Sequence, residues 1–276
     1  MTILTDTYQL ANGVTIPKIG FGTWQIPDGE AYDAVTAALA AGYRHIDTAR
    51  VYGNEVGVGR AVADSGIPRS EVFVTTKLPA EVKTYEGALA SFEESMDALG
   101  LEYVDLYLIH APWPWLEMGS DHSAGNAEAW RAMEEIHLAG RARAIGVSNF
   151  AVADLDALIA ASTLVPQVDQ IKYYVGHTQS EIVEFCRSAG ILVEGFSPLA
   201  TGSLLGNPDV ASIASTYGRS VAQLAIRYSL QHGILPLPKT TSPSRMAENA
   251  DVDFEIADED MAFLDGLTVV DRSPWD

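Results

Sequence analysis

Residues 72–110 read VFVTTKLPAEVKTYEGALASFEESMDALGLEYVDLYLIH, and this stretch decides the fold. It opens with an apolar run at Val72–Thr76 and closes with another at Val104–Ile109, each with the length and side chains of a buried strand. Between them, Thr84–Leu99 has apolar residues at helical spacing, and Gly100 follows where glycine often ends a helix. A strand, a helix and a second strand in this order predict a parallel βαβ unit.

The same alternation continues from about residue 19 to residue 250 and predicts eight strands with helices between them. Strands this apolar are buried on both faces, as parallel strands are. Eight βα units within about 250 residues have the size of a (β/α)8 barrel, so we predict an α/β fold in which residues 1–276 form one TIM barrel domain. The predicted strands are Ile19–Thr23, Arg44–Ile46, Val72–Thr76, Val104–Ile109, Ala144–Val147, Val168–Ile171, Ile191–Phe196 and Ile234–Pro238, and the predicted helices are Glu30–Ala41, Asn54–Ser65, Thr84–Leu99, Ala127–Ala139, Ala151–Ala161, Gln179–Ala189 and Val221–Gln231.

A doubly wound sheet is the competing architecture, and it usually carries a glycine-rich first βα turn. Gly20-Phe21-Gly22-Thr23 lacks the third glycine of that fingerprint, and Gly57-Val58-Gly59 lies inside a predicted helix. The barrel is therefore favoured.

Two segments should close and cover the barrel. Tyr8–Leu10 and Val14–Ile16 flank Ala11-Asn12-Gly13, and Asn-Gly between short apolar runs predicts a β-hairpin that plugs the N-terminal end. Residues 111–126 form the longest irregular connection, which should overhang the opposite, active face.

The composition excludes several classes of partner. The net charge of −20 opposes binding to nucleic acid or to an anionic membrane surface. Cys186 is the single cysteine and is expected to be a core residue, which fits a reducing compartment. The segment Met1–Asp6 lacks the features of a signal peptide, and no apolar run approaches the roughly 18 residues of a membrane span. We expect a cytoplasmic protein with no membrane, nucleic-acid or metal partner.

Four polar residues stand where predicted strands end. Asp47 and Tyr52 follow the second strand, Lys77 follows the third, and His110 follows the fourth. Each alone could be a solvated surface residue, but barrel active sites lie at the carboxyl ends of the strands. We therefore expect the four side chains to meet.

These four groups can transfer a proton to a carbonyl. The pKa of a tyrosine is near 10, and the ammonium of Lys77 should lower it for Tyr52. Asp47 should keep Lys77 charged, and His110 as neutral imidazole can orient a carbonyl oxygen. Tyr52 would then donate its proton to a developing alkoxide, provided that a hydride donor binds beside it.

The eighth strand indicates where such a donor could bind. Leu237-Pro238-Lys239-Thr240-Thr241-Ser242-Pro243-Ser244-Arg245 brings two cations and several hydroxyls to a strand end that leads into a helix. Helix N-termini bind phosphate, and barrels often do so at this corner. The alternative is a pair of solvated charges.

Three separated signatures resemble those of the aldo-keto reductases, nicotinamide-dependent carbonyl reductases on a (β/α)8 barrel, and in particular bacterial members similar to 2,5-diketo-D-gluconate reductase. The first is GYRHIDTA at 42–49, continuing through YGNE at 52–55. The second is RAIGVSNF at 143–150. The third is LPKT at 237–240 with Arg245, Glu248 and Asn249. The resemblance covers nearly the whole chain.

The resemblance implies a role for each matching position. It makes Asp47, Tyr52, Lys77 and His110 a catalytic tetrad, with Tyr52 as general acid. It also implies an NADPH site. In that site the carboxamide would be held by Ser148, Asn149 and Gln170, the nicotinamide would stack on Phe196, and the pyrophosphate would be cradled by Ser197, Leu199 and Thr201. The 2′-phosphate would be contacted by Lys239, Thr240, Thr241 and Arg245, and the adenine would lie near Glu248 and Asn249. An arginine that grips the 2′-phosphate favours NADPH over NADH.

The substrate pocket departs from the family pattern. Members often have His-Trp-Pro after the fourth strand, whereas this chain has Ala111 after His110, so the aromatic wall is expected to be shifted or lost. Trp24, Trp113 and His110 are the candidate substrate contacts. The short loops resemble those of members that reduce small aldehydes, dicarbonyls or keto-sugars, and the family suggests a monomer.

Two other functions use the same residues. In a Schiff-base aldolase or isomerase, Lys77 would be the nucleophile, and Lys239 with Arg245 would bind a substrate phosphate. In a non-catalytic nicotinamide-binding regulatory barrel, the tetrad would be idle.

Overall fold

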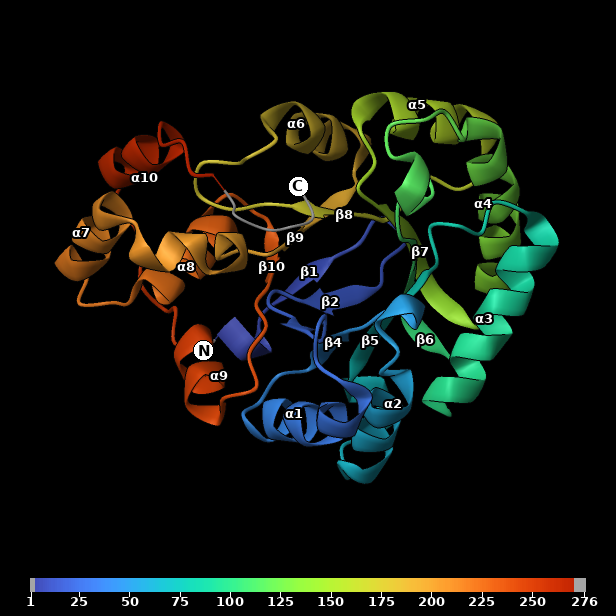
Figure 1. Ribbon diagram of the computed structural model, residues 1–276, viewed down its shortest axis with the longest axis horizontal. Helices are drawn as coiled ribbons and strands as arrows, with labels where there is room; N and C mark the ends of the chain where they lie inside the picture. Colours follow the sequence, from blue (N-terminus) through green and yellow to red (C-terminus); the bar gives the residue numbers. More distant parts are fainter. Residues whose placement is uncertain (1–2, 271–276) are drawn as a thin grey trace.

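The computed structural model describes residues 3–270 and has eight parallel strands at its centre, surrounded by helices (Figure 1). The strands follow one another in chain order. Hydrogen bonds from Gly20 N to Pro236 O and from Gly22 N to Pro238 O join the first strand to the last, so the barrel is nearly closed. The strands are β3 (Phe21–Gly22), β4 (His45–Asp47), β5 (Phe73–Leu78), β6 (Val104–Ile109), β7 (Ala142–Ser148), β8 (Val168–Lys172), β9 (Leu192–Phe196) and β10 (Leu235–Leu237). The predicted barrel and its eight strands are confirmed.

The helices lie outside the barrel, and each of the seven predicted helices is present within a few residues of its expected bounds. Gly100 ends α3 in the left-handed conformation with φ 63°, as predicted. Of the remaining three helices, α9 was expected only as a helix of unstated bounds after the eighth strand, and two were not predicted: α7, whose N-cap Asn207 is a recognisable signal, and α10, in which Leu264 is the buried residue. The helices are α1 (Asp28–Ala40), α2 (Glu55–Asp64), α3 (Tyr85–Leu99), α4 (Ser123–Leu138), α5 (Val152–Ala161), α6 (Ser180–Ala189), α7 (Pro208–Thr216), α8 (Val221–Gln231), α9 (Pro243–Ala250) and α10 (Asp258–Asp265).

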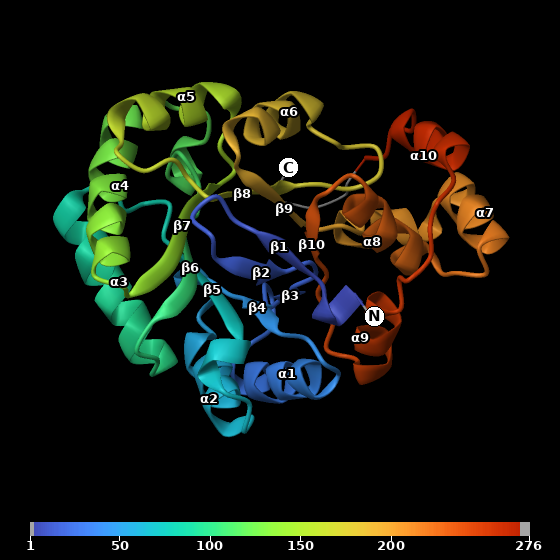
Figure 2. The same cartoon turned by 180° about the vertical axis from the view of Figure 1, so that it is seen from behind.

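The predicted hairpin is also present. Strands β1 (Thr7–Gln9) and β2 (Thr15–Pro17) are antiparallel and lie across one end of the barrel (Figure 2). Leu10 and Ile16 are buried against side chains from the barrel strands. The hairpin is therefore the plug of the N-terminal end.

Two groups of side chains fill the barrel. The group that packs on the hairpin, here called the apolar interior, consists of Phe73, Leu106, Leu108, Ala144, Val168, Leu235 and Leu237. The other group, here called the polar interior, consists of His45, Asp47, Lys77, Gln170 and Glu194, all buried. A bulky aliphatic residue is the usual occupant of a barrel interior, so the polar interior is unusual.

The connection after β6 is shorter than predicted. The sequence suggested an irregular segment over residues 111–126, but α4 begins at Ser123, and a 3-10 turn, η4 (Trp115–Glu117), interrupts the segment. The side chain of Asp121 accepts a hydrogen bond from the backbone N–H of Ser123 at 2.9 Å, which supports the earlier helix start.

Among the described residues, no helix is both long enough and apolar enough to cross a bilayer. Within the same residues, no group of three or more His, Cys, Asp or Glu side chains could hold a metal ion.

Candidate active site

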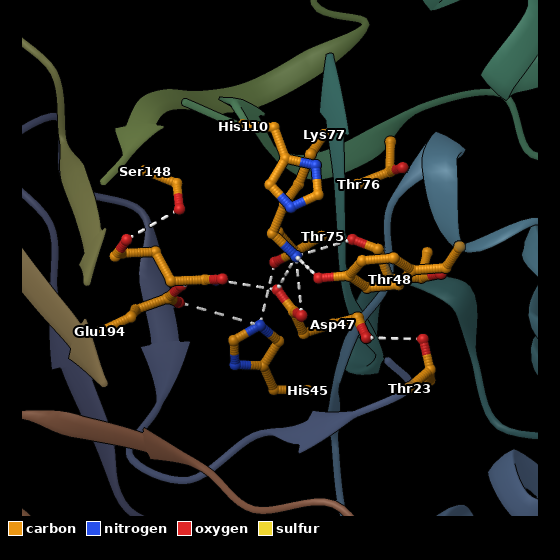
Figure 3. A network of polar contacts seen from close by, with 12 residues as sticks. Thr23, His45, Asp47, Thr48, Thr75, Thr76, Lys77, His110, Ser148 and Glu194 are labelled. Carbon is orange, nitrogen blue, oxygen red and sulfur yellow. Dashed lines mark hydrogen bonds and ion pairs between the residues drawn. The ribbon is translucent and has the colours of Figure 1, made fainter. Parts of the chain in front are cut away.

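The four predicted catalytic side chains meet at the carboxyl end of the barrel. Figure 3 shows three of them, Asp47, Lys77 and His110. Lys77 Nζ lies 2.7 Å from Asp47 Oδ1 and 2.8 Å from Asp47 Oδ2. It also donates to the backbone oxygen of Thr48 at 2.9 Å and reaches the hydroxyl of Tyr52 at 3.4 Å. The rings of Tyr52 and His110 meet edge to face at 5.6 Å between centroids. The structure therefore brings together an acid, an ammonium, a phenol and an imidazole.

The lysine at the centre of this group is charged. Lys77 is fully buried, and burial by itself lowers the pKa of an ammonium. Burial is the largest single effect, but the charge and hydrogen bonding of Asp47, together with the nearby Tyr52 and Glu194, outweigh it, so the pKa of Lys77 is raised above its ordinary value. Asp47 thus keeps the proton on Lys77, as predicted.

The pKa of Tyr52 shifts in the opposite direction from the one predicted. We expected Lys77 to lower it, and the ammonium does act in that direction. Burial has the larger effect, Asp47 adds to it, and the pKa of Tyr52 is raised. The depth of the site, which no local pattern reveals, decides the sign. Tyr52 is therefore a neutral phenol with a proton to donate.

The imidazole of His110 is neutral, as predicted. Burial and then the charge of Lys77 lower the pKa of His110 well below its ordinary value. Its Nδ1 is buried with no hydrogen-bond partner among residues 3–270. Nε2 is not buried in this way, which leaves it as the ring atom able to meet a ligand.

The three predicted carboxamide ligands are neighbours at the ends of β7 and β8. Ser148 Oγ donates to the backbone oxygen of Gln170 at 2.8 Å. Asn149 has the uncommon φ of 62°, and its side-chain nitrogen donates to Ser148 Oγ at 3.0 Å and to the backbone oxygen of His110 at 2.9 Å. These bonds tie the three polar residues to the tetrad.

The loop after β9 has the backbone of a ligand-binding segment. Phe196 ends β9 half-buried, and Ser197, Ala200 and Thr201 follow with φ of 52°, 48° and 51°. Three non-glycine residues at positive φ within five positions store strain, and such strain clusters at ligand sites. Leu199, half-buried, lies within this segment. The loop fits the predicted pyrophosphate cradle.

The cations predicted to bind phosphate are available. Lys239 follows β10 and Arg245 lies in the first turn of α9; both are exposed, and neither forms an ion pair within residues 3–270. Thr240 is buried beside them, and its hydroxyl accepts from the N–H of Ser242 at 3.1 Å. Two unpaired cations at a helix N-terminus suit an anionic group. Of the other predicted contacts, Thr241 is exposed, Glu248 is half-buried and Asn249 is buried.

The aromatic ring next to His110 belongs to Trp115, a residue that the sequence analysis did not single out. The ring of Trp115 meets His110 edge to face at 5.5 Å, and the ring of Trp113 meets Trp115 at 5.3 Å. Trp113 itself lines a depression of about 220 Å³ with Asn149, Phe150 and others. Trp24 is half-buried. Trp115 stands five residues after His110 in an irregular segment, so no periodic pattern could have identified it.

Beneath the tetrad lies a second polar group that the sequence analysis also missed. Gln170 Nε2 donates to Asp47 Oδ2 at 2.9 Å and to Glu194 Oε2 at 2.8 Å. His45 Nε2 pairs with Thr75 Oγ1 at 2.9 Å and lies 3.9 Å from Glu194 Oε1 (Figure 3). A signal was present, because Glu194 is a charged residue inside an otherwise apolar predicted strand.

Comparisons with known proteins point to one family. The sequence model of the protein family described as "Aldo/keto reductase family" matches residues 18–268 of this chain. Glyoxal reductase of Bacillus subtilis is 43% identical over 273 residues, which are 98% of this chain and 96% of the relative. A crystal structure of an aldo/keto reductase from Brucella melitensis has a TM-score of 0.89 at 43% identity and covers 94% of this chain and 97% of that chain. The Bombyx mori aldo-keto reductase in complex with NADP has a TM-score of 0.85 at 34% identity, with 94% and 92% covered.

Proposed function

The chain belongs to the aldo/keto reductase family, and from this premise we propose that it reduces small carbonyl compounds to alcohols with NADPH, using Tyr52 as the proton donor. It is an NADP-dependent oxidoreductase that acts on carbonyl groups. The observation that carries the proposed mechanism is the contact of Lys77 with both Asp47 and Tyr52. That contact places a fixed positive charge beside a phenol that holds its proton.

Each tetrad residue has one task in the proposed reaction. NADPH, when bound, supplies a hydride to the carbonyl carbon. Tyr52 gives its hydroxyl proton to the carbonyl oxygen, and the positive charge of Lys77 stabilises the phenolate that remains. Asp47 holds Lys77 in place and charged. His110 donates from Nε2–H to the carbonyl oxygen and so aims the carbonyl carbon. One hydride and one proton convert the C=O bond into CH–OH.

The residues proposed to hold the cofactor belong to the strained loop, the strand ends and the segment from Lys239 through α9. Lys239 and Arg245, exposed and without an ion pair in the described part of the chain, support the 2′-phosphate assignment and hence NADPH over NADH. The full proposed set is Ser148, Asn149, Gln170, Phe196, Ser197, Leu199, Thr201, Lys239, Thr240, Thr241, Arg245, Glu248 and Asn249.

The proposed substrates are small aldehydes, dicarbonyls or keto-sugars. Similarity to a glyoxal reductase supports this range. His110, Trp24 and Trp113 remain the proposed substrate contacts, and Trp115 joins them because its ring lies against His110. We propose that residues 1–276 act as one monomeric cytoplasmic domain.

The aldolase alternative requires a neutral lysine, because only an uncharged amine attacks a carbonyl. Asp47 lies 2.7 Å from Lys77 and raises its pKa, which opposes that role. A non-catalytic regulatory barrel would have no use for the assembled tetrad.

NADPH oxidation with a panel of carbonyl compounds tests the proposal. Tyr52→Phe should lower kcat/KM by roughly 10²–10⁴-fold while NADPH still binds, because only the donated proton is lost. Arg245→Ala should raise the NADPH Michaelis constant and leave the NADH constant unchanged. Full activity in Tyr52→Phe would reject the mechanism, and an unaltered NADPH constant in Arg245→Ala would reject the phosphate site.

A further inference from the structure

The side-chain amide of Gln170 has both of its hydrogens in use. Gln170 lies on β8 and is almost fully buried. Its Nε2 donates to Asp47 Oδ2 at 2.9 Å and to Glu194 Oε2 at 2.8 Å. An amide nitrogen carries two hydrogens, so these two acidic side chains occupy both. Strand register explains the second contact, because Gln170 and Glu194 are paired residues of β8 and β9.

These two bonds fix which way the amide points. If the amide were turned over, its oxygen would face Asp47, an acceptor that already holds Lys77, and two acceptors would repel each other. The nitrogen therefore faces inward. The amide oxygen of Gln170 accepts no hydrogen bond from residues 3–270, and it is not one of their buried atoms without a partner. It is thus an accessible acceptor at the carboxyl end of the barrel.

Glu194 has no evident structural reason to be in the barrel. Its side chain is fully buried, and Oε1 has no hydrogen-bond partner among the described residues. Burial, and after it the charge of Asp47, raise the pKa of Glu194 to about 8, while burial and then Lys77 lower that of His45 to about 3. Near neutral pH both groups are uncharged, so the 3.9 Å contact between them is not an ion pair. An uncharged carboxyl can still accept from Gln170 through Oε2.

We propose that Glu194 is a positioning residue for the nicotinamide carboxamide: together with Asp47 it holds both amide hydrogens of Gln170, which leaves the amide oxygen of Gln170 to accept from the carboxamide N–H. This inference rests on the proposed function, which assigns Gln170 to the carboxamide. A fixed acceptor selects one orientation of the carboxamide and so one face of the nicotinamide ring for hydride transfer. Without Glu194, the amide of Gln170 keeps one of its two anchors.

Binding of NADPH, followed by quenching of tryptophan fluorescence, tests the role without turnover. Glu194→Leu removes the acceptor and keeps an apolar side chain of similar size, and we expect the Kd for NADPH to rise about tenfold. Glu194→Gln retains an oxygen that can accept from Gln170, and its Kd should stay within about twofold of the original protein. Thermal unfolding of both variants shows that each is folded.

A cofactor analogue separates positioning from a general structural effect. The reduced 3-acetylpyridine analogue of NADPH has an acetyl group in place of the carboxamide and offers no N–H to Gln170. Glu194→Leu should therefore weaken NADPH about tenfold and the analogue less than twofold. Equal weakening of both ligands, or an unchanged NADPH Kd in Glu194→Leu, would overturn the inference and leave the proposed function standing. Failure of the original protein to bind NADPH would overturn the proposed function as well.

Discussion

The apolar interior and the polar interior of the barrel are equally buried, yet they affect folding in opposite ways. Burial of an apolar side chain such as Leu106, Val168 or Leu235 stabilises the fold by roughly 1.5–3 kcal/mol. Burying the charges of Lys77 and Asp47 carries a desolvation penalty, which the attraction between them has to offset before the pair can add to stability. The apolar interior therefore stabilises the fold, whereas the polar interior carries buried charges that serve the proposed reaction and not stability.

The largest expected effects come from the ion pair. Lys77→Met should lower turnover by roughly 10³-fold, because the charge that stabilises the Tyr52 phenolate is gone. It should also lower the free energy of unfolding by about 3–5 kcal/mol, since Asp47 is left buried without a counter-charge. Turnover with NADPH and urea unfolding measure the two effects.

The double variant Asp47→Asn/Lys77→Met provides the control. It removes both charges, so stability should return to within about 1 kcal/mol of the original protein while turnover stays low. If the double variant were as unstable as Lys77→Met, packing and not charge would explain the loss, and the contrast between the two interiors would fail.

The second effect is a pH dependence of stability from Glu194. An unfolded glutamate releases its proton near pH 4.5, whereas folded Glu194, raised by burial and then by Asp47, releases it at about pH 8. Between these values the folded state binds the extra proton, so the free energy of unfolding falls as pH rises, by about 5 kcal/mol in total.

Urea unfolding of the original protein and of Glu194→Gln between pH 5 and 9 checks this prediction. The stability difference between them should shift in favour of the variant across this range and level off above about pH 8. The titrating groups that face Glu194, namely His45, Asp47 and Lys77, are present in both proteins and cancel in the comparison. A difference that stays constant with pH would show that Glu194 is ionised throughout.

The sequence predicted the barrel and the tetrad because both depend on short repeated patterns. A strand such as Val104–Ile109 is readable within a few residues, and His110 then follows at its carboxyl end. The partners of Gln170 are not readable in this way, because Glu194 is 24 positions away and Asp47 is 123 positions away. The sign of the Tyr52 pKa shift was wrong for the same reason: it depends on burial that only the assembled barrel creates.

The apolar interior provides the third prediction. Ile16 of the hairpin is fully buried against the barrel strands, so Ile16→Ala should lower the free energy of unfolding by about 2–5 kcal/mol through a cavity. Its kcat and NADPH Kd should stay within about twofold. Thr15→Ala, at an exposed neighbour on the same strand, should change stability by less than about 0.5 kcal/mol. A large loss of kcat in Ile16→Ala would show that the two interiors are coupled.

The smallest expected effect lies outside both interiors, on the loop above the tetrad. Trp115 is more than one-third exposed and lies against His110, and among residues 3–270 its side chain forms no hydrogen bond that would hold it there, so its ring adds little to stability. Trp115→Ala should leave the free energy of unfolding within about 0.5 kcal/mol of the original value. It should raise the KM for phenylglyoxal about fivefold, because an aromatic substrate loses a ring contact of about 1 kcal/mol.

Glyoxal has no ring to lose such a contact, so its KM should change less than twofold in Trp115→Ala. Trp113→Ala is the matched variant, since Trp113 is a residue that the sequence favoured and its ring meets that of Trp115. If Trp113→Ala raises the KM for phenylglyoxal but not for glyoxal, and Trp115→Ala changes neither, then Trp113 and not Trp115 contacts the aromatic substrate. If Trp115→Ala discriminates, the aromatic side of the pocket is supplied from a loop that contributes almost nothing to folding, and substrate preference can change there without disturbing either interior of the barrel.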